Sequence, residues 1–254
     1  MIRAGTVCHM GIQADDGEDL KEAGRRFAES LTMPPHGPAA EPGRLEELFD
    51  KNTSGPGIWK WRHYFPIYER HFARFVGTGP RIMEIGIYSG GSLRMWQAYF
   101  GAGTRIYGVD IDPACRRYGD ASTSVFIGDQ ADRSFLRDVV SQTPGGFDVV
   151  IDDGGHHTYQ QIATFEEFFP HLRPGGVYLC EDIHLSTNKF WHYLAGLSGR
   201  LHDMAVRSYE FPVNSMQATV AAVTTYPFVA VIEKRLSGIE RLEAPKHGTE
   251  WLDG

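Results

Sequence analysis

The sequence predicts an α/β fold with a seven-stranded, mostly parallel sheet. Short apolar runs alternate with amphipathic helices over residues 81–181, which is typical of parallel strands covered on both faces. Two further apolar runs, 217–224 and 228–234, have only residues 225–227 between them. Because a parallel return needs a crossover of about a dozen residues, these last two runs must form an antiparallel hairpin.

The individual elements follow from the periodicity of apolar residues. Strands are predicted at 81–87, 105–111, 124–127, 147–152 and 176–181, and helices at 92–100, 133–141 and 158–172. Five parallel strands that end in a hairpin predict the Rossmann-like fold of class I S-adenosylmethionine-dependent methyltransferases. Ordinary NAD-binding domains usually lack that hairpin.

A helical extension is expected before the sheet. Residues 15–32 carry Leu20, Phe27 and Leu31 at helical spacing, and Asp15 and Asp16 can cap the helix. A linker rich in proline and glycine follows. The narrow apolar stripe can pack on the main domain or on another subunit, and we expect a homo-oligomer.

Between the linker and the sheet we expect a short helix at 45–49. An aromatic-rich stretch, 59–75, is expected to be mainly helical with an irregularity at Pro66. We therefore assign residues 1–50 to an N-terminal helical extension, acting as a lid or in oligomerisation. Residues 51–254 form the Rossmann-like domain.

Composition limits the class of protein. The chain has 254 residues and a formal net charge of -7, which argues against a nucleic-acid partner because phosphate binding needs a basic surface. No stretch approaches the roughly 18 apolar residues of a membrane span. Three widely spaced cysteines form neither a disulfide framework nor a metal motif. We expect a cytoplasmic protein.

The turn after the first strand has the residues of a cofactor site. Glycines such as Gly86 let the backbone approach a ligand closely, and the helix N-terminus near Ser92 offers free N–H groups to a carboxylate. Such a turn also fits NAD. Glu84, placed to meet an ammonium group, and a spacing that departs from GxGxxG favour S-adenosylmethionine.

The next two strands end in further polar residues. Asp110 suits ribose hydroxyls, and Asp129 with Gln130 suits an adenine amino group. All of them fall at carboxyl ends of strands, where open α/β sheets bind ligands. The sequence therefore predicts an adenosyl-ligand site.

Four carboxylates stand at the ends of the fourth and fifth strands: Asp152, Asp153, Glu181 and Asp182. Their mutual repulsion requires a cation or protons, and oxygen ligands favour Mg²⁺, with Mn²⁺ or Ca²⁺ as alternatives. Since neighbouring strand residues face opposite ways, we assign Asp152 to the cofactor and Asp153 to the metal.

A nearby histidine can serve as the base. His156 lies three residues beyond Asp153, and an imidazole suits removal of a proton from a hydroxyl made acidic by a metal. His184 is the competing candidate.

These motifs together resemble the metal-dependent sugar O-methyltransferases of antibiotic biosynthesis, which include enzymes of the mycinamicin, tylosin and calicheamicin pathways. The resemblance rests on Gly90–Trp96, Tyr107–Ile111, Gly128–Gln130, Ile151–His156 and Glu181–His184, within about residues 50–190. Two departures are that most of the N-terminal domain of the macrolide enzymes is lacking, and that Gly155 stands where serine is expected.

The resemblance implies Asp153, Glu181 and Asp182 as Mg²⁺ ligands and His156 as general base. It also implies that Trp61–Tyr64 and Tyr68 belong to a segment that closes over the cofactor, in which Tyr64 would bind the cofactor. The implied substrate is a small-molecule sugar or nucleotide sugar, such as a TDP-deoxysugar, or a glycosylated natural product.

Other functions stay open at this point. A phenol or catechol O-methyltransferase could use the same metal chemistry, and a non-catalytic subunit could bind S-adenosylmethionine without turnover. A nicotinamide-dependent dehydrogenase would leave the hairpin and the acidic residues unexplained.

Overall fold

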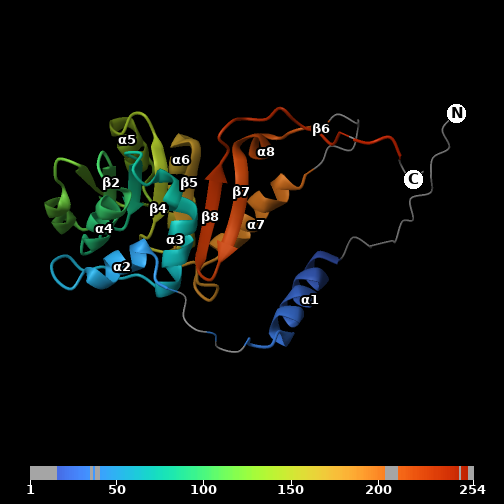
Figure 1. Cartoon of the computed structure of the whole chain (residues 1–254), viewed down its shortest axis with the longest axis horizontal. Coiled ribbons are helices and arrows are strands. Elements are labelled where there is room, and N and C mark those ends of the chain that lie inside the picture. The colour runs from blue at the N-terminus through green and yellow to red at the C-terminus, as the bar shows by residue number, and fades with distance from the viewer. Residues whose placement is uncertain (1–15, 35–36, 38–40, 204–210, 246, 251–254) are drawn as a thin grey trace. The chain divides into compact units, whose positions relative to one another are not determined.

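The computed structural model describes residues 16–34, 37, 41–203, 211–245 and 247–250 of the chain (Figure 1). Residues 42–244 form one compact unit, and the described part of a second unit contains one helix, α1 (Asp16–Ser30). α1 corresponds to the helix expected at 15–32, whose proposed cap Asp15 lies outside the described residues.

A seven-stranded sheet forms the centre of the larger unit, in the order β3-β2-β1-β4-β5-β8-β7. Its strands are β1 (Arg81–Ile85), β2 (Arg105–Asp110), β3 (Thr123–Ile127), β4 (Phe147–Asp152), β5 (Leu172–Cys180), β7 (Val220–Tyr226) and β8 (Val229–Lys234). Strands β1 to β5 pair in parallel, whereas β8 lies antiparallel between β5 and β7. The expected sheet and its closing hairpin are confirmed.

Helices cover both faces of this sheet (Figure 1). One layer contains α2 (Arg44–Lys51), η1 (Arg62–Tyr64), α3 (Phe65–Phe72), η2 (Ala73–Phe75) and α4 (Gly91–Phe100). The other contains α5 (Arg133–Gln142), α6 (Thr158–Phe168), η4 (Phe169–His171), α7 (Phe190–Leu201) and α8 (Ser215–Thr219). The short η3 (Pro113–Tyr118) follows β2, and β6 (Phe211–Pro212) pairs with β9 (Arg241–Leu242).

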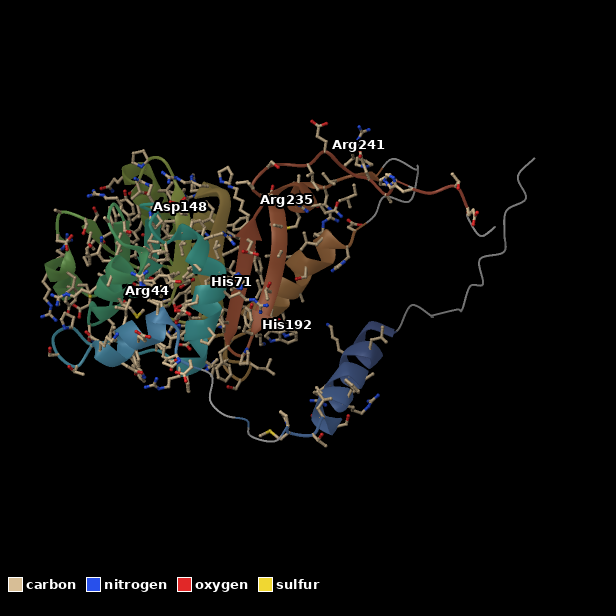
Figure 2. All side chains as sticks on the ribbon, in the orientation of Figure 1. Arg44, His71, Asp148, His192, Arg235 and Arg241 are labelled. Carbon is tan, nitrogen blue, oxygen red and sulfur yellow. The ribbon has the colours of Figure 1, made fainter. Side chains whose placement is uncertain are left out.

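Strand residues alternate between two buried clusters, as the pleat requires. In β1, Ile82 packs with the layer of α3 and α4, whereas Met83 packs with the layer of α5 and α6. The amino ends of the central strands are tied by Asp148, labelled in Figure 2. Its Oδ2 accepts from the Arg81 N–H at 2.8 Å and from the Arg173 guanidinium at 3.0 Å.

The structure corrects the start of the first hairpin strand. Residues predicted as strand from 217 belong instead to α8, and β7 begins at Val220. Asn214 and Gln217 form a reciprocal capping box, in which each side chain bonds the other residue's backbone N–H. That box stabilises one helical turn before the strand.

The stretch 59–75 was predicted as mainly helical, and its first residues are not. Helical structure begins only at Arg62, and Pro66 occupies the first turn of α3, where a missing N–H is not needed. Proline therefore starts this helix rather than interrupting one. The predicted helix 158–172 ends in η4, which contains Pro170, and β5 starts at Leu172. The helix α7 was not predicted.

Among the described residues, no helix has both the length and the apolar character needed to cross a membrane.

We predict that α2 contributes to the stability of the larger unit. Leu45 in α2 is 0% exposed and packs in the core of the α3 and α4 layer. Leu45→Ala should lower the free energy of unfolding by about 2–5 kcal/mol in denaturant titrations, because it leaves a cavity. Leu20→Ala in α1, where Leu20 is 65% exposed, is the control and should change it by less than about 0.5 kcal/mol. Equal, small effects of both changes would show that α2 is not part of the core.

Candidate active site

A cavity of about 720 Å³ lies at the carboxyl ends of the parallel strands. It is placed where the chain order reverses between β1 and β4, as expected for ligand sites in open α/β sheets. Its volume lies in the usual range of small-molecule and cofactor sites. The candidate residues that line it are Tyr64, Gly86, Ser92, Asp110, Asp129, Gln130, Asp153, His156, Glu181, Asp182 and His184.

The turn from β1 to α4 packs closely against the loop after β4. Gly86 has φ +91°, and a Cβ there would lie 2.0 Å from the carbonyl oxygen of Asp153. Only glycine allows this approach. Asp110 fixes the same turn, because its Oδ2 accepts from the N–H groups of Ile87 and Tyr88 at 2.8 and 2.9 Å. The sequence-predicted residues Gly86 and Asp110 therefore meet at one wall of the cavity.

Glu84 lies beneath the cavity and does not line it. Its carboxylate is fully buried and accepts from Ser92 Oγ and Trp96 Nε1, both at 3.0 Å. Burial raises the pKa of Glu84 to about 7, although the charge of Lys60 and the two hydrogen bonds oppose this rise. Glu84 thus contacts the predicted cofactor site through Ser92.

Asp152 also lies below the cavity, which differs from the expectation that it faces the cofactor. Its side chain is fully buried and accepts from Tyr178 Oη at 2.9 Å and Gln130 Nε2 at 3.2 Å. Burial raises the pKa of Asp152 to about 6 against these bonds. Gln130 is the residue that reaches the cavity, and its Oε1 accepts from the Gly155 N–H at 2.6 Å. Asp129 is exposed at the rim, and its Oδ1 accepts from the Ala131 N–H at 2.8 Å.

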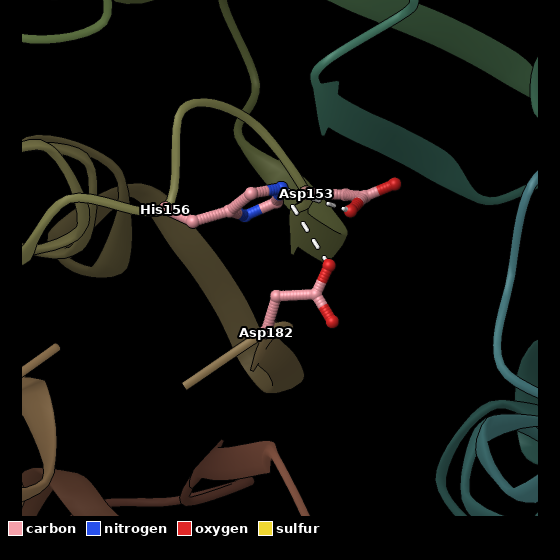
Figure 3. Close-up of side chains that lie close together, drawn as sticks. All are labelled: Asp153, His156 and Asp182. Carbon is pink, nitrogen blue, oxygen red and sulfur yellow. Dashed lines mark ion pairs between the residues drawn. The ribbon is translucent and has the colours of Figure 1, made fainter. Parts of the chain in front are cut away.

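Asp153, His156 and Asp182 come together at the other end of the cavity (Figure 3). One ligand atom of each lies within 4.8 Å of the others. His156 Nε2 is 3.5 Å from Asp182 Oδ2 and 4.0 Å from Asp153 Oδ1. His156 and Asp182 have φ of 58° and 54°, a conformation that side chains disfavour and that is common at functional sites.

Both candidate bases adjoin the same carboxylate. His184 Nε2 lies 3.7 Å from Asp182 Oδ1, on the other oxygen from His156. Tyr64 Oη donates to Asp182 Oδ1 at 2.6 Å, and Trp61 Nε1 donates to it at 3.1 Å. Burial and the Asp182 charge raise the pKa of Tyr64 above its ordinary value, so the phenol stays a donor. The structure thus connects Tyr64 to the acidic residues.

Glu181 occupies a different position from Asp153 and Asp182. Its carboxylate accepts from Lys60 Nζ at 2.9 and 3.0 Å and from Tyr68 Oη at 2.7 Å. Lys60 Nζ also donates to Asp153 Oδ2 at 2.6 Å. Burial alone would lower the pKa of Lys60, but Asp153 and Glu181 outweigh it and raise that pKa, so the ammonium stays charged. Burial raises the pKa of Glu181, and Lys60 counters that rise.

Sequence reasoning did not find Lys60, and it expected Trp61 and Tyr68 only as part of a segment that closes over the cofactor, not as donors to Asp182 and Glu181. The local pattern gave no signal for Lys60, because alternation of Trp59, Lys60 and Trp61 in extended backbone predicts the tryptophans inward and the lysine outward, the reverse of what the structure shows. A lysine on the inward side needs a carboxylate partner.

The residues present fit a hard divalent cation and an adenosyl ligand. Asp153 and Asp182 offer carboxylate oxygens, and His156, the third side chain of the group, turns its Nε2 toward both of them. Gly86 and the turn after it leave the backbone approachable from the cavity. The third predicted metal ligand, Glu181, is bonded by Lys60. Of the three predicted ligands, Asp153 and Asp182 therefore have an oxygen that faces His156 across the cavity.

The strand order, the glycine turn and the position of the cavity define the fold of class I S-adenosylmethionine-dependent methyltransferases. Comparison with known proteins agrees. Residues 83–183 match the family model described as a methyltransferase domain. The structure of the MycE methyltransferase of the mycinamycin pathway, solved with Mg, SAH and mycinamycin VI, superposes with a TM-score of 0.64 and 29% identity. That match covers 76% of this chain and 54% of MycE.

Curated relatives confirm the resemblance to sugar O-methyltransferases of antibiotic pathways. A Streptomyces olivaceus tetracenomycin rhamnosyl 3'-O-methyltransferase is 37% identical over 67% of this chain and 44% of its own length. The mycinamicin VI 2''-O-methyltransferase of Micromonospora griseorubida is 40% identical over 48% of this chain and 32% of its own length. The chain spans about half the length of the relatives that it matches most extensively.

We predict that Glu84 makes stability depend on pH. An acid whose pKa rises from 4.5 to about 7 on folding stabilises the fold at low pH, and this contribution is lost as the pH rises through 7. As the pH rises from 4.5 to 8, the free energy of unfolding of Glu84→Gln should therefore increase relative to that of wild type by up to about 3 kcal/mol. Denaturant titrations of both proteins across this range measure the difference. The exposed Glu240→Gln is the control, and a Glu84→Gln curve parallel to wild type would contradict the prediction.

Proposed function

We propose that this chain is an S-adenosylmethionine- and Mg²⁺-dependent O-methyltransferase that acts on a sugar hydroxyl in antibiotic biosynthesis. The observation that carries the proposal is the meeting of Asp153, His156 and Asp182 at one end of the cavity formed by the glycine turn. The names of the relatives support a sugar acceptor. The Mg and SAH bound in MycE support the two cofactors, with Mn²⁺ or Ca²⁺ as alternatives to Mg²⁺.

The cofactor would occupy the wall of the cavity built by β1, β2 and β3. Gly86 and Ser92 would receive its methionine part above Glu84, and Asp110 would receive the ribose hydroxyls. Asp129 and Gln130 lie at the end of β3, where an adenine would lie. Asp152 holds Gln130 in place, and Tyr64 closes the site near Asp182.

When bound, S-adenosylmethionine supplies the methyl group, and Mg²⁺ on Asp153 and Asp182, with Glu181 as the third proposed ligand, makes a sugar hydroxyl more acidic. His156 would accept the hydroxyl proton on Nε2, the ring nitrogen that faces both carboxylates. Asp182, 3.5 Å away, favours the imidazolium that forms. Trp61 and Tyr64 hold Asp182 in that orientation.

The remaining parts of the proposal concern the acceptor and the assembly. A TDP-deoxysugar or a finished glycoside would be the small-molecule substrate, and no nucleic acid is involved, consistent with the acidic charge. The N-terminal extension, proposed as residues 1–50, would assemble a cytoplasmic homo-oligomer through α1, whose apolar residues have helical spacing. Its last residues, from Arg44 on, belong to α2 and pack in the larger unit.

Calorimetric titration tests the proposal directly. S-adenosylhomocysteine is titrated into chelator-treated protein, and TDP-rhamnose is then titrated with and without Mg²⁺. We expect micromolar binding of S-adenosylhomocysteine and sugar binding only when Mg²⁺ is present. If S-adenosylhomocysteine binds but TDP-rhamnose shows no Mg²⁺-dependent binding, either this sugar is not the acceptor or the metal site is wrong. If S-adenosylhomocysteine does not bind, the proposal that the chain is a methyltransferase is wrong.

We predict that His156 is the base. His156→Ala should lower kcat for methyl transfer by about 10²- to 10⁴-fold, because no group then accepts the hydroxyl proton, while S-adenosylhomocysteine affinity stays unchanged. His184→Ala is the matched comparison, since His184 adjoins the other oxygen of Asp182. Undiminished turnover by His156→Ala together with loss in His184→Ala would transfer the role to His184.

A further inference from the structure

Among the described residues, Lys60 is the only lysine or arginine within hydrogen-bonding distance of Asp153, Glu181 or Asp182. Its side chain is 2% exposed, and its ammonium lies within 3.0 Å of both Asp153 and Glu181. The two carboxylates therefore face each other across a single Nζ atom. Without a cation between them they would repel each other in a buried environment.

Backbone and side-chain contacts of residues 57–61 place the Lys60 ammonium at the acidic residues. The carbonyl of Gly57 accepts from the Gly91 N–H at 3.1 Å, and Trp61 Nε1 donates to Asp182, so residues 57–61 span from the start of α4 to the acidic residues. Trp59 and Trp61 are 84% and 51% exposed, whereas Lys60 points inward. Such alternation is typical of extended backbone, and Trp61 has extended backbone angles of φ -68° and ψ 133°.

Asp153 uses its two oxygens for different neighbours. Oδ2 bonds Lys60, whereas Oδ1 faces His156 and, across it, Asp182. A divalent cation that draws oxygens to about 2.0–2.1 Å would compete for the same pair of carboxylates, because ammonium and metal cannot share the gap between them.

We propose that Lys60 is a resident counter-ion, which holds Asp153 and Glu181 together in the metal-free state and is exchanged for the divalent cation. This inference rests on the proposed function, since it assumes that these carboxylates bind a metal. Lys60 also lines the cavity, so its flexible four-carbon stem has a path for the ammonium to move away from the carboxylates. Because the bonds of Lys60 to Asp153 and Glu181 anchor segment 57–61, losing them in the exchange would loosen that segment.

Two properties of the purified full chain test the exchange. In Lys60→Met, calorimetric titration of Mg²⁺ alone should show affinity increased by about tenfold or more, because no internal cation must be displaced. The same variant should have a lower Tm than wild type in chelator and a larger rise in Tm on addition of Mg²⁺. The exposed Lys51→Met is the matched control and should resemble wild type in both measurements.

The outcomes separate this inference from the proposed function. If wild type binds Mg²⁺ and Lys60→Met binds it no more tightly, Lys60 is not a competitor and the exchange is wrong. If neither protein binds Mg²⁺, the metal requirement of the proposed function fails as well. If Lys60→Met does not fold, hydrogen exchange of wild type decides: faster exchange at residues 57–61 on adding Mg²⁺ supports the exchange, and unchanged rates overturn it.

Discussion

Parallel pairing of β1, β4 and β5 determines where the functional side chains of this molecule lie. Asp152 stands opposite Ile85 on one side and Cys180 on the other, and the ladder continues one residue further, because the Asp153 N–H bonds Ile85 and the Glu181 N–H bonds Asp152. The residues that follow each strand are therefore forced to one edge. That edge collects the glycine turn after β1, Asp153 after β4, and Glu181 and Asp182 after β5.

The acids at this edge would repel one another as carboxylates, and the structure offsets this repulsion in three different ways. Glu84 and Asp152 lie fully buried with hydrogen-bond donors around them, and burial shifts the pKa of each upward. Asp153 and Glu181 share the Lys60 ammonium. Asp182 remains nearer the surface, where it receives a phenol and an indole and faces two histidines. Only this last arrangement, with the free oxygen of Asp153, leaves acids open to a ligand.

The sequence predicted what depends on strand periodicity and failed where contacts come from distant segments. The alternation of strands and helices was sufficient for the sheet and its hairpin, and strand ends were sufficient to bring His156 near Asp182. The rule that neighbouring residues face opposite ways correctly separated Asp152 from Asp153. The rule could not say which of the two side chains would face the cavity and which would face the protein interior. Asp152 proved to be fully buried. α7 was not assigned from the pattern.

Lys60 shows why local pattern underdetermines a site. An extended segment brings alternate residues to one face, and in 57–61 that face meets Asp153, more than ninety positions later in the chain. A helix over the same residues would turn Lys60 and Trp61 about 100° apart, whereas the extended segment lets one bond Glu181 while the other bonds Asp182. Two consecutive acids, Glu181 and Asp182, are thus met by two consecutive donors, Lys60 and Trp61. The helical prediction for 59–75 placed these donors wrongly, and the same error concealed the buried Lys60.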